Sequence, residues 1–109
     1  MNWFGKRRKV ELMYAAIRQA RAKTGKAEEL ASLIKEGAIP IISGVAGFKA
    51  YYVVYAPDDM VTAIGIFENH AGAEEANRLG LAWIERNLTP LLAGPVAASA
   101  GPVIVHTLA

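Results

Sequence analysis

The sequence FKAYYVVYAPDDMVTAIGIF, residues 48–67, contains two apolar runs that are separated only by Pro57-Asp58-Asp59. A strand with one face in water alternates apolar and polar residues, because successive side chains point to opposite faces of the sheet. The alternation is missing here, since apolar residues fill one parity (Phe48, Ala50, Tyr52, Val54, Ile64 and Ile66) and also the other (Tyr51, Val53, Tyr55, Val61, Ala63 and Phe67). We therefore predict a β-hairpin that is covered on both faces.

The residues before the hairpin predict a strand and then a helix. Residues 12–21 form the strand, which is apolar on both parities until charge takes over. From Ala27 the period changes to that of an amphipathic helix, with apolar residues at Leu30, Leu33, Ile34, Ala38 and Ile41. Pro40 should kink or end this helix, because proline lacks a backbone donor and clashes with the preceding turn.

A second helix and a last strand follow the hairpin. Asn69 can cap the helix through its side-chain oxygen. The inward stripe of this helix consists of Ala73, Ala76, Asn77, Gly80, Trp83, Ile84 and Asn87. The last strand runs from about Val96 to Leu108 and is interrupted at Gly101-Pro102.

The order strand, helix, strand, strand, helix, strand predicts an α+β fold of the ferredoxin-like type. In this βαββαβ fold both helices pack on one face of an antiparallel sheet. The other face would then expose apolar side chains, and a second copy of the sheet can cover it. We expect a homodimer that joins through these faces into an α/β barrel.

Length and charge limit the other possibilities. The 109 residues suffice for one domain, which we place at residues 11–109, after a flexible basic extension at residues 1–10. The four basic residues at 6–9 leave eight bases against ten acids in the remainder, which disfavours nucleic-acid binding. No apolar run is long enough to cross a membrane. The absence of cysteine fits a reducing compartment, so we expect a cytoplasmic protein.

Several segments resemble the dimeric α/β-barrel superfamily, and specifically small bacterial proteins related to antibiotic-biosynthesis monooxygenases. The segments are residues 47–52, 64–69 and 71–78, Trp83-Ile84, and residues 102–106, within a similarity that spans about residues 12–107. The resemblance implies the fold more strongly than a function, because the superfamily contains several different activities.

The resemblance implies a cofactor-independent, monooxygenase-like protein that acts on or binds a small apolar or aromatic molecule. In such relatives the deprotonated phenolic substrate supplies the electrons, so the protein needs an apolar pocket and a few groups that stabilise the anion. The candidate catalytic residues are Asn77, Trp83 and His106. The candidate substrate-binding residues are Tyr51, Tyr52 and Tyr55, opposite the inward stripe of the second helix.

Each candidate also has a purely structural explanation. Trp83 has the spacing of a core residue of a sheet-packed helix. Asn77 is an amide on an apolar stripe, and its bond can go to nearby backbone as readily as to a ligand. His106 can be a proton carrier or an exposed strand histidine.

Haem and metal chemistry are disfavoured by the residues present. Haem-degrading relatives use an asparagine on the first strand, where this chain offers Gln19, and no histidine follows Trp83 within the second helix. His70 and His106 lie far apart and the carboxylates lie on wet faces, so we expect no metal site and no cofactor.

The alternative is a non-enzymatic homodimer that binds a metabolite or a partner. A cavity of about 300 Å³ or more beside Asn77 would favour the monooxygenase hypothesis. A filled core at that place would favour the alternative.

Overall fold

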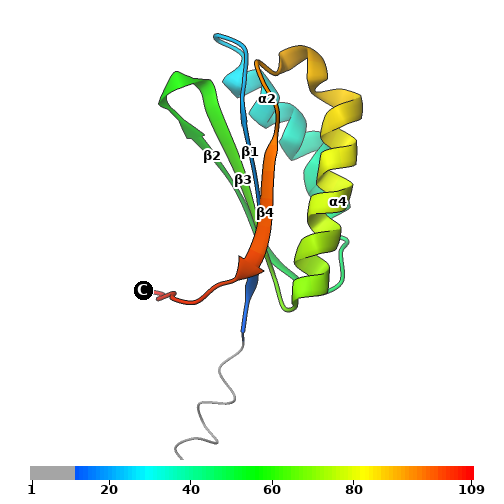
Figure 1. The fold of residues 1–109 in the computed structure, drawn as a ribbon, viewed down its shortest axis with the longest axis vertical. Helices are drawn as coiled ribbons and strands as arrows, with labels where there is room; N and C mark the ends of the chain where they lie inside the picture. Colours follow the sequence, from blue (N-terminus) through cyan, green and yellow to red (C-terminus); the bar gives the residue numbers. More distant parts are fainter. Residues whose placement is uncertain (1–11) are drawn as a thin grey trace, which may run out of the picture.

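The computed structural model describes residues 12–109, so the expected basic extension at residues 1–10 lies outside the described residues. Four strands form one antiparallel sheet in the order β2-β3-β1-β4 (Figure 1). The strands are β1 (Tyr14–Arg21), β2 (Phe48–Ala56), β3 (Met60–Phe67) and β4 (Ala97–Pro102). This order, with its antiparallel pairing, confirms the ferredoxin-like βαββαβ prediction.

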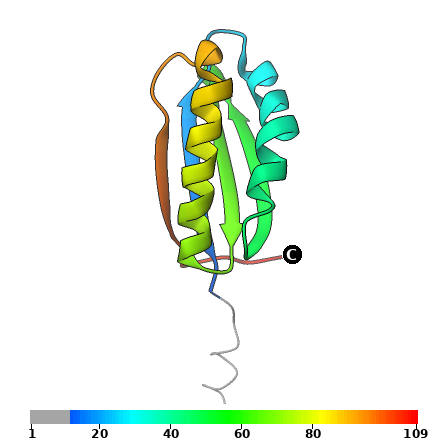
Figure 2. The ribbon, with the colours of Figure 1, turned by 90° about the vertical axis from the view of Figure 1, so that its right-hand side faces the viewer.

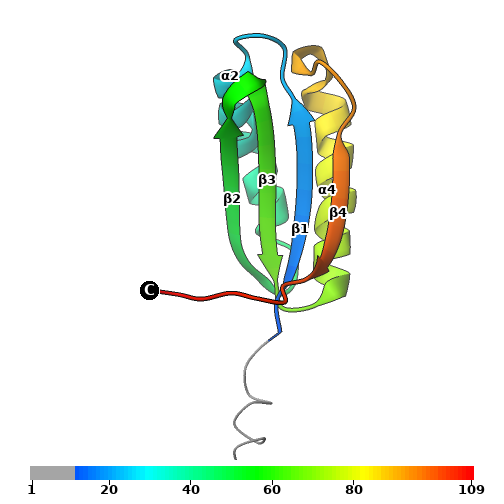
Figure 3. The same cartoon turned by 60° about the vertical axis from the view of Figure 1, so that its left-hand side comes forward.

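The helices all lie on one face of the sheet, as predicted (Figure 2). They are α2 (Ala27–Leu33), the π-helical turn η1 (Ile34–Ala38), α3 (Ile39–Ile42) and α4 (His70–Asn87). The 3₁₀ turns η2 (Pro57–Asp59) and η3 (Thr89–Leu91) close the hairpin and follow α4. No helix of the described residues covers the opposite face of the sheet (Figure 3).

The helical segment between β1 and β2 changes its winding just before Pro40. The Ile39 amide donates to the Ile34 carbonyl, which is an i→i+5 bond of a π turn. The wider turn accommodates Pro40, which has no amide to donate and would crowd the carbonyl four residues earlier in a regular helix. Pro40, which was predicted to kink or end the helix, follows a π turn, and the helix continues through α3.

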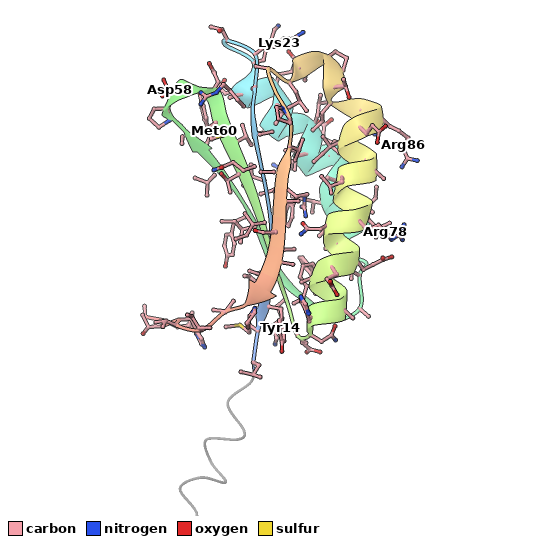
Figure 4. All side chains as sticks on the ribbon, viewed as in Figure 1. Tyr14, Lys23, Asp58, Met60, Arg78 and Arg86 are labelled. Atoms are coloured by element: carbon pink, nitrogen blue, oxygen red, sulfur yellow. The ribbon has the colours of Figure 1, made fainter. Side chains whose placement is uncertain are left out.

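Helix α4 begins where the sequence indicates. The Gly72 amide donates to the Asn69 side-chain oxygen at 2.7 Å, which confirms the predicted cap. The buried residues of α4 are Gly72, Ala73, Ala76, Gly80 and Trp83, so most of the predicted inward stripe faces the sheet. Arg78 and Arg86 project from the outer side of the helix (Figure 4).

Two details of the strands differ from the prediction. A register shift between Phe48 and Ala50 turns Phe48 to the helix side, where its ring lies 5.8 Å from that of Phe67. Strand β4 ends at Pro102, after which the Val103 amide still donates to the Met13 carbonyl at 2.8 Å. His106, which we expected on the last strand, therefore lies beyond it.

The uncovered face of the sheet carries apolar side chains. Ile17, Tyr52 and Val54 are 37%, 57% and 48% exposed, and Ile64 and Ile66 share their face. The final residues leave the body on this uncovered side (Figure 1), with Ile104 and Val105 almost fully exposed. Among residues 12–109, no helix has the length and apolarity needed to cross a membrane.

Candidate functional site

A buried arginine lies at the centre of the layer between helices and sheet. Arg18 is on β1 and has the same parity as Ala16 and Ala20, which places its side chain under α4. Its exposed fraction is only 3%, and it is the one charged side chain in the buried core of the described residues. The strand is apolar on both parities only until charge takes over, yet the cover extends past Arg18 to Ala22, which is 2% exposed.

Two neutral side chains hold the guanidinium. Arg18 Nη1 donates to Asn77 Oδ1 at 2.8 Å, and Arg18 Nη2 donates to Tyr51 Oη at 2.8 Å. The Asn77 amide nitrogen in turn donates to the Ser99 carbonyl at 2.8 Å. The Arg18 cluster, defined as Arg18, Tyr51 and Asn77, therefore links β1, β2 and α4, and Asn77 extends it to β4.

The positive charge of this cluster has no carboxylate partner. None of the ion pairs among residues 12–109 involves Arg18. A guanidinium has five N–H donors, and the two bonds to Asn77 and Tyr51 leave three without an acceptor among the described residues. A buried charge of this kind is unfavourable unless an anion or water meets it. No buried side-chain nitrogen or oxygen of the described residues lacks a partner, so the unused N–H groups belong to nitrogens that already donate once or that reach solvent, while the charge itself has no counter-ion there.

Gly80 makes room for the guanidinium on α4. A Cβ atom at this position would lie 2.7 Å from Arg18 Nε and 2.8 Å from Arg18 Cζ. Real Cβ atoms do not approach other heavy atoms this closely, so any larger residue would displace the guanidinium. Glycine in a helix interior destabilises it by about 1 kcal/mol relative to alanine. The absence of a side chain at Gly80 is thus required by the position of Arg18.

A small apolar cavity adjoins the arginine. It is lined by Arg18 and by apolar residues of both layers, including Leu30, Ile34 and Val61, and has a volume of about 20 Å³. This volume accommodates about one water molecule. Asn77 does not line it. This cavity is therefore not the ligand-sized space beside Asn77 that would favour the monooxygenase hypothesis.

A larger groove lies on the outside of the same wall. It has a volume of about 510 Å³ and runs between the C-terminal half of α4 and the segment at 92–96. Ile84, Leu92 and Val96 line both the groove and the small cavity. Three side chains thus separate a groove of the size of typical ligand pockets from the cavity beside Arg18.

The other predicted site residues lie apart from this cluster. Trp83 packs in the core with Leu30 and Ile34, and a Cβ at Gly37 would lie 2.3 Å from its ring. Tyr52 lies on the uncovered face of the sheet and not opposite α4, so this part of the expected geometry is corrected. Tyr55 is 56% exposed at the end of the hairpin.

The histidines and acids give no metal site within residues 12–109. No group of three or more potential ligands comes together there. His106 is exposed in the C-terminal segment, and His70 stacks on Tyr14 at the start of α4. Of the six predicted site residues, the structure brings only Asn77 and Tyr51 together.

Arg18 was missed as a site residue, although a signal was present. It shares its parity with Tyr14, Ala16, Ala20 and Ala22, and all of these positions are uncharged. A single charge among small residues on one parity of a strand indicates a charged side chain that points into the protein. Gln19, on the opposite parity, was considered only because haem-degrading relatives have an asparagine on the first strand.

Solved structures of other proteins have a fold similar to that of this chain. No family model matches the sequence, and no curated protein matches it. The structure is similar to a protein of unknown function from Nitrosomonas europaea, with a TM-score of 0.73 and 19% identity over 91% of this chain and 96% of that one. It is also similar to the ActVA-Orf6 monooxygenase of Streptomyces coelicolor, solved with nanaomycin D, with a TM-score of 0.70 and 18% identity over 90% and 93% of the two chains.

A third similar structure is a candidate antibiotic biosynthesis monooxygenase from Nitrosomonas europaea. Its TM-score is 0.69 and its identity 14%, over 86% of this chain and 92% of that one. These similarities confirm the resemblance at the level of the fold. At such identities the activity has to be argued from the side chains of this chain.

Proposed function

We propose that the protein binds a small apolar or aromatic molecule between α4 and the sheet, and that it oxidises this molecule with oxygen and no cofactor. The observation that supports this proposal is the Arg18 cluster. It places a cation with unused N–H donors next to apolar walls, where an anion is stabilised far more than in water. The groove along α4 lies on the other side of Ile84, Leu92 and Val96, and in this proposal these three side chains move aside to admit the molecule to the cluster.

The chemistry needs only the substrate and oxygen. A positive guanidinium favours the ionised form of a bound phenol and so lowers its pKa. The phenolate can then pass electrons to O₂, and the carbon para to the oxygen gains one oxygen atom. The overall reaction converts a phenol and O₂ into a quinone and water, with no external reductant. In this scheme Arg18 holds the anion, and Tyr51 and Asn77 hold Arg18.

The alternative is a homodimer that binds a metabolite or partner without turnover. The observation that favours it is the cavity beside Arg18, which holds about one water molecule and does not reach Asn77. In that case the cluster serves to tie β1, β2, β4 and α4 together. The two hypotheses share the binding surface and differ in whether oxygen is consumed.

We also propose that the protein is a cytoplasmic homodimer. The support for the dimer is the apolar uncovered face of the sheet, which a second copy would bury. The segment 103–109 extends on the same side, and its exposed Ile104, Val105 and Leu108 can contact the second copy. The support for the compartment is the absence of cysteine.

The test combines native mass spectrometry with oxygen consumption. Freshly purified protein is weighed for subunit number and for any retained small molecule, and a panel of one- and two-ring phenols is then added in an oxygen-electrode cell. Consumption that exceeds the protein-free rate and falls in Arg18→Met supports the oxidation. A bound small molecule with no oxygen consumption supports the alternative. If no phenol and no retained molecule binds, the oxidation hypothesis is wrong, and a bare dimer favours the alternative.

A further inference from the structure

We infer that the ligand of this protein is a small aromatic carboxylic acid, and that Arg18 binds its carboxylate. The inference rests on the proposed function, because it assigns the chemical class of the molecule that enters beside α4. For such an acid the anion that Arg18 holds is the carboxylate and not the phenolate, and a hydroxyl elsewhere on the ring remains the group that is oxidised.

The unpaired positive charge of Arg18 favours the binding of an anion. Arg18 is 3% exposed, its bonded partners Asn77 and Tyr51 are neutral, and no carboxylate of residues 12–109 pairs with it. The acids of the helices, such as Glu75 and Glu85, lie on the outer, wet sides. An anion that balances Arg18 would therefore come from outside the described part of the chain.

The donors of Arg18 favour a carboxylate over a single oxygen. Three N–H groups remain after the bonds to Asn77 and Tyr51, and they are fixed in the plane of the guanidinium. A carboxylate presents two oxygens with a spacing that matches two parallel N–H groups. The plane is held by the two bonds and by the Tyr51 ring, whose centre lies 5.8 Å from Arg18 Cζ.

The apolar side chains around Arg18 favour an acid whose remaining atoms are apolar. The small cavity beside Arg18 is lined by apolar residues except for Arg18 itself and Gln19, and Ile84, Leu92 and Val96 form the wall toward the groove. A strongly hydrated anion such as phosphate would lose its water there without replacement. An aromatic ring would instead bury apolar area against these side chains.

The test compares a charged ligand with its neutral isostere. Binding of 1-naphthoate and 1-naphthamide to the full-length protein is measured by calorimetry at neutral pH. We expect naphthoate to bind at least about tenfold more tightly than the amide, in keeping with a charge-assisted, two-pronged hydrogen bond. Arg18→Met should weaken naphthoate binding to within about threefold of the amide and weaken amide binding much less, since the amide loses only a hydrogen bond to a neutral carbonyl.

Two further variants keep the result clear. Arg21→Gln removes an exposed cation of the same strand and should leave both affinities unchanged. Gly80→Ala retains the charge but places a Cβ 2.7 Å from Arg18 Nε, so it should selectively weaken naphthoate binding even if Arg18→Met does not fold.

The outcomes separate this inference from the proposed function. Equal binding of acid and amide to the wild type would overturn the carboxylate while small-molecule binding stands. The same holds if naphthoate binding survives in both Arg18→Met and Gly80→Ala. If neither compound binds, the inference fails together with the ligand-binding proposal.

Discussion

On its covered face the sheet buries a cation, whereas on its uncovered face it exposes apolar side chains. Arg18 is 3% exposed under α4, and Tyr52 is 57% exposed on the opposite side. Both placements are unfavourable in an isolated chain, since a buried charge lacks its counter-ion and an apolar patch meets water. The difference teaches that the two proposed partners are of different kinds, an anion for the covered face and another apolar surface for the uncovered face.

The largest effect is expected when a charge is placed on the uncovered face. Ile17 lies on the inner strand β1, opposite Ile64 on β3 and Ser99 on β4. In Ile17→Lys the ammonium would be buried between two stacked sheets without a partner, at a cost of several kcal/mol, or at least about 100-fold in the dimer dissociation constant. Sedimentation equilibrium should show a dimer for the wild type and a monomer for the variant.

The control for this change lies on the helix side. Leu81 on α4 is 36% exposed, against 37% for Ile17, but belongs to the opposite side of the molecule. Leu81→Lys should leave the dimer intact. If the wild type is monomeric, or if Ile17→Lys still forms a dimer of the same strength, the uncovered face is not the interface.

The next effect concerns the packing that covers the other face. Trp83 is 9% exposed and fills the space over Gly37 so closely that a Cβ there would lie 2.3 Å from its ring. Trp83→Ala should lower the free energy of unfolding by about 3–5 kcal/mol, because it leaves a cavity of the size of an indole. Urea titration followed by circular dichroism measures the change.

A smaller ring at the same position sharpens this test. Trp83→Phe should lower stability by less than Trp83→Ala and should tolerate Gly37→Ala better than the wild type does, since the shared space is partly vacated. A loss below 1 kcal/mol in Trp83→Ala would contradict the core role.

A third effect tests how the Arg18 cluster is held. Asn77→Ala removes the acceptor of Arg18 Nη1 and the donor to the Ser99 carbonyl. Leaving these partly buried groups unpaired should lower the free energy of unfolding by about 1–3 kcal/mol. On the same helix, Asn87 is exposed and donates only to the Trp83 carbonyl, so Asn87→Ala should change stability by less than about 0.5 kcal/mol. Equal losses in the two variants would show that the cluster has no special role.

Much of the covered face could be predicted from the sequence, because local signals determine it. The doubly apolar hairpin, the Asn69 cap and the disturbance at Pro40 each follow from a few neighbouring residues, and all three are present. Their order along the chain then leaves few topologies other than the ferredoxin-like sheet.

The errors have their origin in long-range or irregular geometry. A bulge after Phe48 reverses the face of that residue, and strict alternation cannot reveal a bulge. Tyr52 alternates with Tyr51, so only one of the two can face α4, and the helix side takes Tyr51. Arg18 is recognised as an interior residue only once Gly80, which is far away in sequence, is known to lie above it.

The smallest effect belongs to the outer side of α4, which neither face of the sheet touches. Arg78 donates to both carboxylate oxygens of Glu75, at 2.7 and 2.6 Å, and this hydrogen bonding lowers the pKa of Glu75 below its ordinary value of 4.5. A carboxyl group whose pKa is lower in the folded state adds stability above its unfolded pKa and loses that contribution as the pH falls through the folded pKa. The difference in melting temperature between the wild type and Glu75→Gln should therefore be small at pH 7 and absent at pH 2.

Both side chains are exposed, so solvent and salt screen the pair, and 0.5 M NaCl should also remove the difference. Glu85→Gln, which removes an exposed carboxylate of the same helix that forms no ion pair among residues 12–109, is the matched control variant. A large, salt-resistant effect of Glu75→Gln would mean that this side of α4 is also covered by a partner, and that the contrast between the two faces of the sheet does not account for every surface of the molecule.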